Sequence, residues 1–282
     1  MSAKAADSAV DLSLVERALA EDLGTGDLTA LIVPGDVSAT AILSTREDLV
    51  LCGAAWFDAV FALLDPDVAV QWLASDGDYI DGGAELCRVS GRARALLSGE
   101  RTALNILQTL SGTATRARLY ARAVAGTRAK VLDTRKTIPC LRLAQKYAVR
   151  VGGCFNHRQG LYDGILIKEN HILAAGSIAR AVEAARALGV NVPIEIEVED
   201  LAELDQALEA GAERILLDNF EMDSLRKAVV RTVGLAQLEV SGNVSLDSIR
   251  ELAETGVDFI SVGDLTKNLR AIDLSLRISL DS

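Results

Sequence analysis

The second half of the chain alternates short apolar runs with helix-like stretches, and this alternation limits the folds open to it. Runs rich in β-branched residues lie at residues 130–133, 165–167, 194–198, 215–217, 238–240 and 259–262. Apolar residues recur at helical spacing at residues 141–151, 178–188, 201–210, 224–233 and 246–253. Four of these helices are followed by a glycine, as helix ends often are: Gly189, Gly211, Gly234 and Gly256. Strands joined by helical crossovers predict a parallel sheet.

The number of repeats favours a barrel over an open sheet. Six or seven strand–helix units suit a closed or nearly closed α/β barrel. An open doubly wound sheet is the alternative, but no GxGxxG motif follows a first strand, which weakens a dinucleotide-binding fold. We therefore expect an α/β barrel in this half of the chain.

The first part of the chain predicts a different architecture. Residues 54–64 indicate a helix, and residues 69–73 and 84–89 indicate strands around the turn-rich segment SDGDYIDGG. That segment resembles the turns of biotinyl and lipoyl domains but lacks the lysine that those carriers modify, so we interpret it as structural. Residues 94–125 predict a helical connection, in which Gly112 is a candidate bend because glycine costs about 1 kcal/mol in a helix interior. Residues 272–280 alternate in polarity and predict a strand that returns to this domain.

Composition excludes several classes of protein. The chain has 40 acidic and 29 basic residues, and a net charge of −11 argues against nucleic-acid binding. No apolar run reaches the roughly 20 residues of a membrane span, and the N-terminus lacks a cleavable signal pattern. We therefore expect a cytoplasmic protein with neither nucleic-acid nor membrane partners. The cysteines are scattered, which predicts reduced thiols without a metal site: Cys52, Cys87, Cys140 and Cys154.

One segment of this acidic chain is basic. Between Lys130 and Asn170 stand eight Lys or Arg and only three acids. Five basic side chains fall on successive strand–helix units: Arg135, Lys136, His157, Arg158 and Lys168. The active site of an α/β barrel lies at the carboxyl ends of its strands, where these side chains would converge. They predict a pocket for a small ligand with more than one anionic group. A solvated basic face is the alternative.

Acids and glycines follow the later strands. Glu197 and Asp218 could together hold Mg²⁺, or they could pair with the bases of the same pocket. Alternation sends Glu195 and Glu199 to the same face as Glu197. Two segments after the last strands could bind a phosphate through backbone N–H groups, or could be simple turns: Ser241-Gly242-Asn243 and Val262-Gly263-Asp264. No nucleophile with a paired base stands out, so we expect a pocket that positions anionic ligands.

Two long motifs resemble those of a known family. DTRKTIPCLRLAQKYAVRVGG at residues 133–153 and NHRQGLYDGILIKENHI at residues 156–172 closely resemble the signatures of quinolinate phosphoribosyltransferases. Further segments match in order: EDLGTGDLT, GERTALNILQTLSGTAT, IEIEVE, LLDNF, EVSGN and SVGDLTK. The resemblance spans nearly the whole chain.

The resemblance implies a fold, an assembly and a reaction. It implies an N-terminal α/β sandwich domain, residues 1–112 with the returning tail 271–282, and an incomplete α/β barrel of about seven strands, residues 113–270. It implies homodimers, or assemblies of dimers, that share active sites between subunits. The reaction joins quinolinate to phosphoribosyl pyrophosphate with Mg²⁺ and yields nicotinate mononucleotide, pyrophosphate and CO₂, in de novo NAD synthesis.

The resemblance also assigns roles to residues. The quinolinate carboxylates would be held by Arg135, Lys136, His157, Arg158 and Lys168, with Thr134 beside them and Arg101 reaching in from the neighbouring subunit. Glu197 and Asp218 would serve Mg²⁺ and the ribose, and would act as catalytic residues with Lys136 and Lys168. The donor phosphate would contact two segments: Ser241, Gly242 and Asn243, and Val262, Gly263 and Asp264.

Three positions depart from the usual family pattern. The family commonly has glycine at Cys140 and Asn243 and alanine at Asp264. An inward Asp264 would repel a phosphate, so we expect it to point away or to pair with a base.

Three other functions remain as alternatives. A paralogue from molybdenum-transport operons shares the fold, but we expect that group to lose the Asn and Tyr-Asp of NHRQGLYD. Nicotinate phosphoribosyltransferase lacks the decarboxylation, and its monocarboxylate substrate needs fewer cations. A non-catalytic binding module would use the biotinyl-like segment as its interaction surface, which the absent lysine and the basic cluster argue against.

Overall fold

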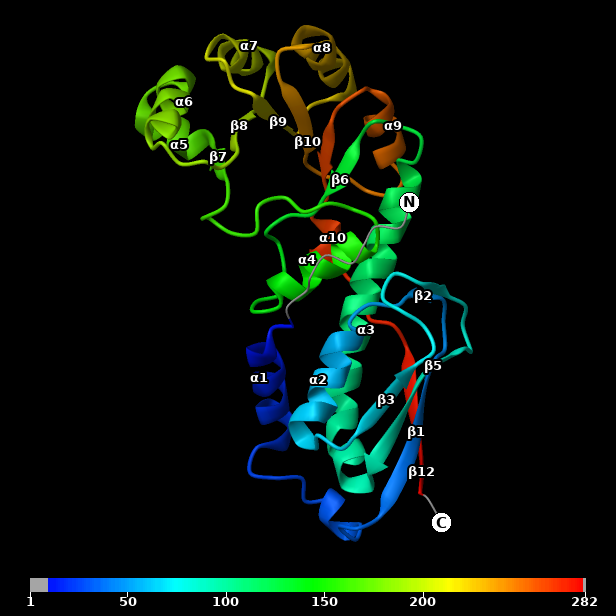
Figure 1. The fold of residues 1–282 in the computed structure, drawn as a ribbon. Coiled ribbons are helices and arrows are strands. Elements are labelled where there is room, and N and C mark those ends of the chain that lie inside the picture. Colours follow the sequence, from blue (N-terminus) through cyan, green and yellow to red (C-terminus); the bar gives the residue numbers. More distant parts are fainter. Residues whose placement is uncertain (1–9, 281–282) are drawn as a thin grey trace. The chain divides into compact units, whose positions relative to one another are not determined.

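The computed structural model describes residues 10–280 and divides the chain into two compact units (Figure 1). The first unit comprises the described parts of Met1–Arg118 and Leu269–Ser282 together with Ile138–Gly153; the second comprises Leu119–Thr137 and Cys154–Asn268. No helix of the described residues is long and apolar enough to cross a membrane. These boundaries differ from the predicted domain boundary between residues 112 and 113. That boundary stays a prediction.

The first unit is built on an antiparallel sheet of four strands in the order β12-β1-β5-β3. Its strands are β1 Ser38–Thr45, β3 Ala69–Trp72, β5 Glu85–Arg92 and β12 Leu274–Leu280. Strands β2 Leu49–Val50 and β4 Tyr79–Ile80 form a separate pair. The unit also holds α1 Leu12–Leu23, the short helix η1 Ala30–Ile32, α2 Ala54–Leu64, most of α3 Ala93–Ala123, and α4 Arg142–Val151. The predicted returning tail is confirmed, because β12 pairs with β1 along its length.

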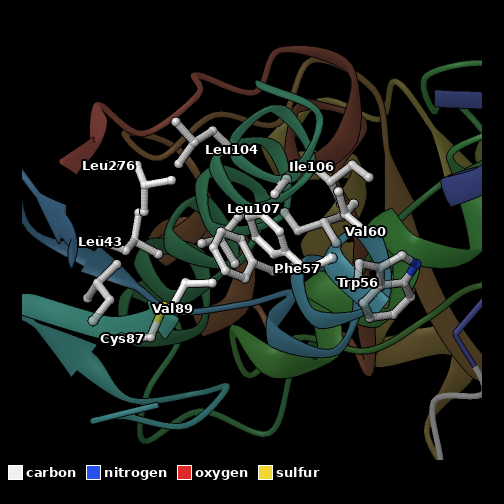
Figure 2. Close-up of a cluster of buried hydrophobic side chains, with 14 of the residues drawn as sticks. Leu43, Trp56, Phe57, Val60, Cys87, Val89, Leu104, Ile106, Leu107 and Leu276 are labelled. Carbon is white, nitrogen blue, oxygen red and sulfur yellow. The ribbon is translucent and has the colours of Figure 1, made fainter. Parts of the chain in front are cut away.

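Alternating side chains of the sheet pack against the helices to form the core of this unit. In β1 every second residue is buried, from Ala39 to Thr45. Figure 2 shows Leu43 and Val89 of the sheet near Phe57 of α2 and Leu107 of α3, all fully buried. Burying side chains of this size stabilises the fold by about 1.5–3 kcal/mol each. The sequence prediction missed β1, because small residues in SATAILST weaken its apolar signal.

Glycine 112 has a use other than the bend we expected. Helix α3 runs through Gly112 without interruption. A Cβ added at Gly112 would lie 2.2 Å from the carbonyl oxygen of Arg270, so the glycine allows the returning chain to approach the helix. The amide of Ile272 then donates to the carbonyl of Gln108 at 3.2 Å. Close backbone packing, which local sequence does not reveal, explains why glycine stands in this helix.

The helix after the first barrel strand belongs to the first unit as well. Residues 141–151 were expected to be a helix and form α4, but Ala144 and Ala148 lie in the core of the first unit. The Tyr147 hydroxyl donates to Asp76 at 2.9 Å. A Cβ at Gly152 would lie 2.3 Å from the carbonyl oxygen of Ala114, so α4 ends directly against α3.

The second unit is the predicted parallel sheet, with six strands in the order β6-β11-β10-β9-β8-β7. The strands are β6 Lys130–Leu132, β7 Ile165–Ile167, β8 Ile194–Val198, β9 Arg214–Asp218, β10 Gln237–Ser241 and β11 Phe259–Ser261. Each coincides with a predicted strand within one residue at either end. The helices of this unit are α5 Glu169–Ala175, α6 Ile178–Ala187, α7 Leu201–Glu209, α8 Met222–Thr232, α9 Ile249–Glu254 and α10 Asp264–Lys267 (Figure 1). Of these, α6, α7, α8 and α9 pack against the strands, and α5 packs against α6.

The expected seventh strand is reduced to a single bridge. Phe155 pairs in parallel with Leu132 on the open side of β6. Its amide donates to Val131 and its carbonyl accepts from Asp133. From Phe155 the sheet continues through β6, β11, β10, β9 and β8 to β7. Within the described residues β7 does not pair back to Phe155, so the barrel is incomplete, as predicted.

Replacing Gly112 with alanine should destabilise the protein, although Gly→Ala in a helix usually stabilises it by up to about 1 kcal/mol. The new methyl group would overlap the Arg270 carbonyl, and overpacking of this kind costs about 1–3 kcal/mol. Urea unfolding followed by tryptophan fluorescence measures this, since both tryptophans, Trp56 and Trp72, lie in the first unit. Gly35→Ala is the control, because its Cβ would meet only ordinary contacts at 3.8 Å. Equal stability of Gly112→Ala and wild type would contradict the packing role.

Candidate active site

A cavity of about 180 Å³ lies at the carboxyl ends of the strands of the second unit. The residues after β6 and β7 and the last residues of β8, β10 and β11 contribute to it. Its walls are formed by Thr134, Arg135, Lys136, His157, Arg158, Leu166, Lys168, Glu197, Leu216, Glu239, Ser241 and Ser261. The structure thus brings together all five basic residues that the sequence predicted to converge.

The turn after β6 presents Arg135 and Lys136. Its shape is fixed by hydrogen bonds: the Lys136 amide donates to the Thr134 hydroxyl at 3.1 Å, and the Thr266 hydroxyl donates to the Lys136 carbonyl at 2.8 Å. A Cβ added at Gly263 would lie 3.3 Å from Cδ of Lys136, so this glycine leaves room for the lysine chain. These hydrogen bonds therefore fix the backbone that carries Arg135 and Lys136.

A buried carboxylate positions the next two basic residues. Asp133 is fully buried at the end of β6, and its Oδ1 accepts from the His157 amide at 2.9 Å. Its other oxygen accepts from the Asn156 side chain. These bonds place His157 and Arg158 beside the Arg135 turn. Asp133 stands in the predicted basic segment but was not assigned a role from sequence.

Arg158 lies among other charges at the pocket wall. One guanidinium nitrogen donates to the carbonyl of Gly164 at 3.1 Å. Burial lowers the pKa of Arg158, and the positive charge of Arg135 lowers it further. An arginine remains charged despite such a shift, because its ordinary pKa lies above 12. The site thus keeps two guanidinium groups close together, an arrangement that an anionic ligand would stabilise.

Lys168 and Glu197 form an ion pair across neighbouring strands. Lys168 follows β7, and its Nζ contacts Oε2 of Glu197 on β8. The Lys168 amide donates to Nδ1 of His171 at 3.0 Å, which fixes the turn into α5. Pairing between Glu197 and a base of the pocket was one of the two alternatives predicted for this acid.

Asp218 does not line the cavity. It ends β9 opposite Ser241 of β10, and its Oδ2 accepts from the Asn219 side chain at 2.8 Å. Glu197 and Asp218 therefore come from adjacent strands and offer hard carboxylate oxygens, the ligand type that Mg²⁺ prefers.

The two predicted phosphate segments differ from expectation in part. Of these six residues only Ser241 lines the cavity. The amide of Val262 donates to the carbonyl of Leu132 in the sheet, so it is already used. Gly242 has a φ of 102°, and a Cβ there would lie 2.1 Å from Oδ1 of Asn219. This glycine is required by its turn.

Asp264 points both carboxylate oxygens at neutral donors. Tyr120 donates to Oδ2 and Asn268 donates to Oδ1, each at 2.9 Å. Sequence analysis expected this acid to turn away or to pair with a base. These two hydrogen bonds contribute to holding its carboxylate in place.

Beneath the cavity lies a buried ionic cluster that the sequence analysis did not identify. Arg214 at the start of β9 bridges two carboxylates: its Nε donates to Glu195 at 3.0 Å, and its terminal nitrogen contacts Glu239. Glu195 and Glu239 are 3% and 0% exposed. The Ser261 hydroxyl donates to Glu239, and His157 lies 2.9 Å from Glu195. Charged residues inside the apolar runs of β8 and β10 were the available sequence signal.

The cluster shifts the pKa values of its two carboxyl groups in opposite directions. Burial, and then the charge of Glu195, raises the pKa of Glu239 to about 7. Burial opposes ionisation of Glu195 as well, but the His157 hydrogen bond and Arg214 outweigh it and lower the pKa of Glu195. Potential ligand atoms of His157, Glu195 and Glu239 lie within 4.8 Å of one another, as they would around a metal ion. The guanidinium of Arg214 already pairs with both carboxylates and takes the place of a cation, so the group does not fit a metal ion.

An incomplete α/β barrel with a cation-lined cavity at its strand ends is an arrangement of enzymes that act on small anions. Comparison with known proteins identifies the family. Models of the quinolinate phosphoribosyl transferase N-terminal and C-terminal domains match residues 27–111 and 113–277. The chain belongs to the quinolinate phosphoribosyltransferase family, as the motifs predicted.

Individual relatives agree with this assignment. The chain is 43% identical to a probable nicotinate-nucleotide pyrophosphorylase [carboxylating] of Bacillus subtilis, over 93% of this chain and 91% of the relative. It is 42% identical to the corresponding protein of Mycobacterium leprae, over 93% and 95%. A solved nicotinate-nucleotide pyrophosphorylase of Francisella tularensis is 46% identical, with a TM-score of 0.94 over 99% of this chain and 100% of that chain.

Replacing Glu239 with glutamine should change how stability depends on pH. A carboxyl group whose pKa rises from 4.5 to about 7 on folding stabilises the fold below pH 4.5 and loses that contribution as the pH rises through 7. Glutamine mimics the protonated acid at every pH. Relative to wild type, Glu239→Gln should therefore be more stable at pH 8 than at pH 5, by about 1–3 kcal/mol.

Urea unfolding followed by far-UV circular dichroism at the two pH values measures this difference. Glu209→Gln, on the exposed side of α7, is the matched control and should show little change with pH. A Glu239→Gln variant with the same pH dependence as wild type would show that Glu239 keeps an ordinary pKa in the fold.

Proposed function

We propose that this protein catalyses the Mg²⁺-dependent reaction of quinolinate with phosphoribosyl pyrophosphate, giving nicotinate mononucleotide, pyrophosphate and CO₂, in de novo NAD synthesis. The observation that carries the proposal is the convergence of four cations on one cavity: Arg135, Lys136, Arg158 and Lys168. Family membership supports it, and relatives of this chain are named for this activity.

The charge of the cavity favours a dicarboxylate over a monocarboxylate. Two guanidinium groups and two ammonium groups line a space of about 180 Å³, together with the carboxyl groups of Glu197 and Glu239. Burial raises the pKa of Glu239 to about 7, which reduces its negative charge. Quinolinate brings two negative charges, which distribute over these cations, and Arg binds a carboxylate through two parallel hydrogen bonds. Nicotinate would neutralise only half as much charge. This difference argues for quinolinate over nicotinate as the substrate.

The acids serve the ribose side of the reaction. Displacement of pyrophosphate breaks the C1–O bond and leaves positive charge on the ribose, which a nearby carboxylate stabilises. Glu197 and Asp218 end adjacent strands and supply this negative charge. The same two residues would hold Mg²⁺, which stabilises the charge of the departing pyrophosphate when it is bound.

The cations also serve the decarboxylation. Loss of CO₂ leaves an electron pair on the ring carbon beside the ring nitrogen, and a proton then takes its place. Positive charge held in the cavity lowers the energy of that electron pair. Arg158 and Lys168 can supply it, because hydrogen bonds of their own turns fix their positions.

We further propose a cytoplasmic homodimer, or an assembly of such dimers, in which Arg101 enters the active site of the neighbouring subunit. Arg101 lies on α3 with its side chain 62% exposed, 4.0 Å from Glu100, and is available to a partner. None of the four cysteines, all of which lie within the described residues, forms a disulfide, and this suits a reducing compartment.

The direct test is to incubate the protein with quinolinate, phosphoribosyl pyrophosphate and Mg²⁺ and to measure CO₂ and nicotinate mononucleotide. Product from quinolinate supports the proposal. Product from nicotinate alone would instead identify a nicotinate phosphoribosyltransferase, and absence of product from both would leave the binding-module alternative.

Replacing Arg158 or Lys168 with alanine should reduce quinolinate turnover at least about 100-fold, because a charge-assisted contact to a carboxylate is lost. Far-UV circular dichroism should show an unchanged fold. Lys227→Ala is the matched control, since Lys227 is an exposed lysine of helix α8. Full activity in either site variant would overturn the assignment of the carboxylate pocket.

Mixing two inactive variants tests the shared site. Arg101→Ala and Lys168→Ala should each be inactive alone, but mixed dimers would contain one site with both residues intact. Co-expression should therefore restore activity, to about a quarter of wild type when the subunits combine at random. If activity stays absent while mixed dimers form, Arg101 acts within its own subunit or not at all.

A further inference from the structure

Both ring nitrogens of His157 have a hydrogen-bond partner, the Arg158 amide at Nδ1 and the Glu195 carboxylate at Nε2. Its Nδ1 lies 2.7 Å from the backbone nitrogen of Arg158, which donates to it. A backbone N–H can only donate, so Nδ1 must present a lone pair. A neutral ring then carries its proton on Nε2, which lies 2.9 Å from Oε2 of Glu195 and donates to it. The contacts thus select one tautomer.

The alternative is a charged imidazolium, which the electrostatics of the cluster alone would allow. Arg214 and a charged His157 would together balance Glu195 and Glu239. An imidazolium, however, carries a proton on Nδ1, and two N–H groups would then face each other at 2.7 Å. A proton on Glu239 balances the cluster equally well, and burial raises the pKa of Glu239 to about 7.

We propose that His157 is a neutral positioning residue that fixes Arg158, and that it does not bind a substrate carboxylate as a cation. This inference rests on the proposed function only in that Arg158 is taken to bind a carboxylate of quinolinate. His157 accepts from the Arg158 amide and donates to Glu195, so it joins the pocket wall to the buried cluster. Its side chain is only 13% exposed, which suits a residue that positions a neighbour better than one that contacts the substrate directly.

Arg214 completes the support from the far side. Its Nε donates to Oε1 of Glu195 at 3.0 Å, while His157 donates to Oε2 of the same carboxylate. The guanidinium carbon of Arg214 lies 4.1 Å from the centre of the Phe259 ring. Glu195 is therefore held from both sides, and it transmits a fixed position through His157 to Arg158.

Nitrogen NMR of ¹⁵N-histidine-labelled protein tests the tautomer directly. The chain has two histidines, so His171→Gln leaves a single labelled ring to assign. At about pH 7, below which a free imidazole becomes charged, we expect Nε2 to be protonated and Nδ1 to be unprotonated. The pattern should persist when quinolinate is added. An imidazolium, or a proton on Nδ1, in either state would overturn the proposal.

Substitutions of His157 distinguish a positioning role from a need for positive charge at this residue. In His157→Gln the side-chain amide can donate to Glu195, whereas His157→Ala cannot. We expect KM for quinolinate to rise less than about 3-fold in the glutamine variant and about 10–100-fold in the alanine variant, with kcat less affected. Equal loss in both variants, with partial recovery in His157→Lys, would show that positive charge is needed. If wild type does not use quinolinate, the proposed function is wrong, but the role of His157 is not, because the NMR measurement on the free protein does not depend on turnover.

Discussion

A single partly buried arginine organises the second unit. Arg214 enters the barrel at the start of β9 and contacts acids from β8 and β10, the strands on either side. Two carboxylates in an apolar interior are costly unless a cation and hydrogen bonds compensate them. Because the compensation comes from the middle strand, the three strands must keep one register. The residues at their carboxyl ends, where Glu197 and Ser241 reach the cavity, are then held in place.

The same cluster connects the interior of the barrel to its rim. Glu195 reaches His157, and His157 meets the amide of Arg158. Asp133 holds the same short segment from β6. The segment that carries His157 and Arg158 has almost no sheet structure of its own, because its ladder is one bridge at Phe155. The buried acids Asp133 and Glu195 therefore position the segment that carries His157 and Arg158, which a full strand would otherwise do.

Sequence patterns correctly predicted the features that depend on residues close together in the chain. Strand–helix alternation and the glycines after the helices gave the barrel, and Gly189, Gly211, Gly234 and Gly256 all have the positive φ expected of helix ends. Basic residues after consecutive strands converge because all parallel strands end on one side, so the cation wall followed from periodicity alone.

What sequence analysis missed depends on partners distant along the chain. In the sequence Arg214 and Glu239 are isolated charges, and they meet only because β9 and β10 are neighbouring strands of the sheet. The same limit applies to Gly112, whose role is set by the carbonyl of Arg270. It also applies to α4, which follows a barrel strand in sequence but packs with the first unit. In each case the deciding contact joins segments that no local pattern connects.

The turns after β10 and β11 each carry a polar side chain that their local structure accommodates. Asn243 has a φ of 49°, in the left-handed region that favours glycine, and asparagine enters this region more readily than other side chains. The turn after β10 therefore tolerates asparagine at position 243. Asp264 directs its oxygens to Tyr120 and Asn268, which draws its charge toward two donors.

Lys136 links the two sides of the pocket. It lines the cavity with the other cations, and its Nζ lies 3.9 Å from the position that a Cβ of Gly263 would occupy. A side chain at that position would restrict the lysine, whereas glycine leaves it space between the cavity and the turn after β11. An ammonium group has no preferred plane and can serve carboxylate and phosphate oxygens alike. Lys136 therefore lies between the cation-lined cavity and the turn after β11, where an ammonium group fits without the fixed plane of a guanidinium.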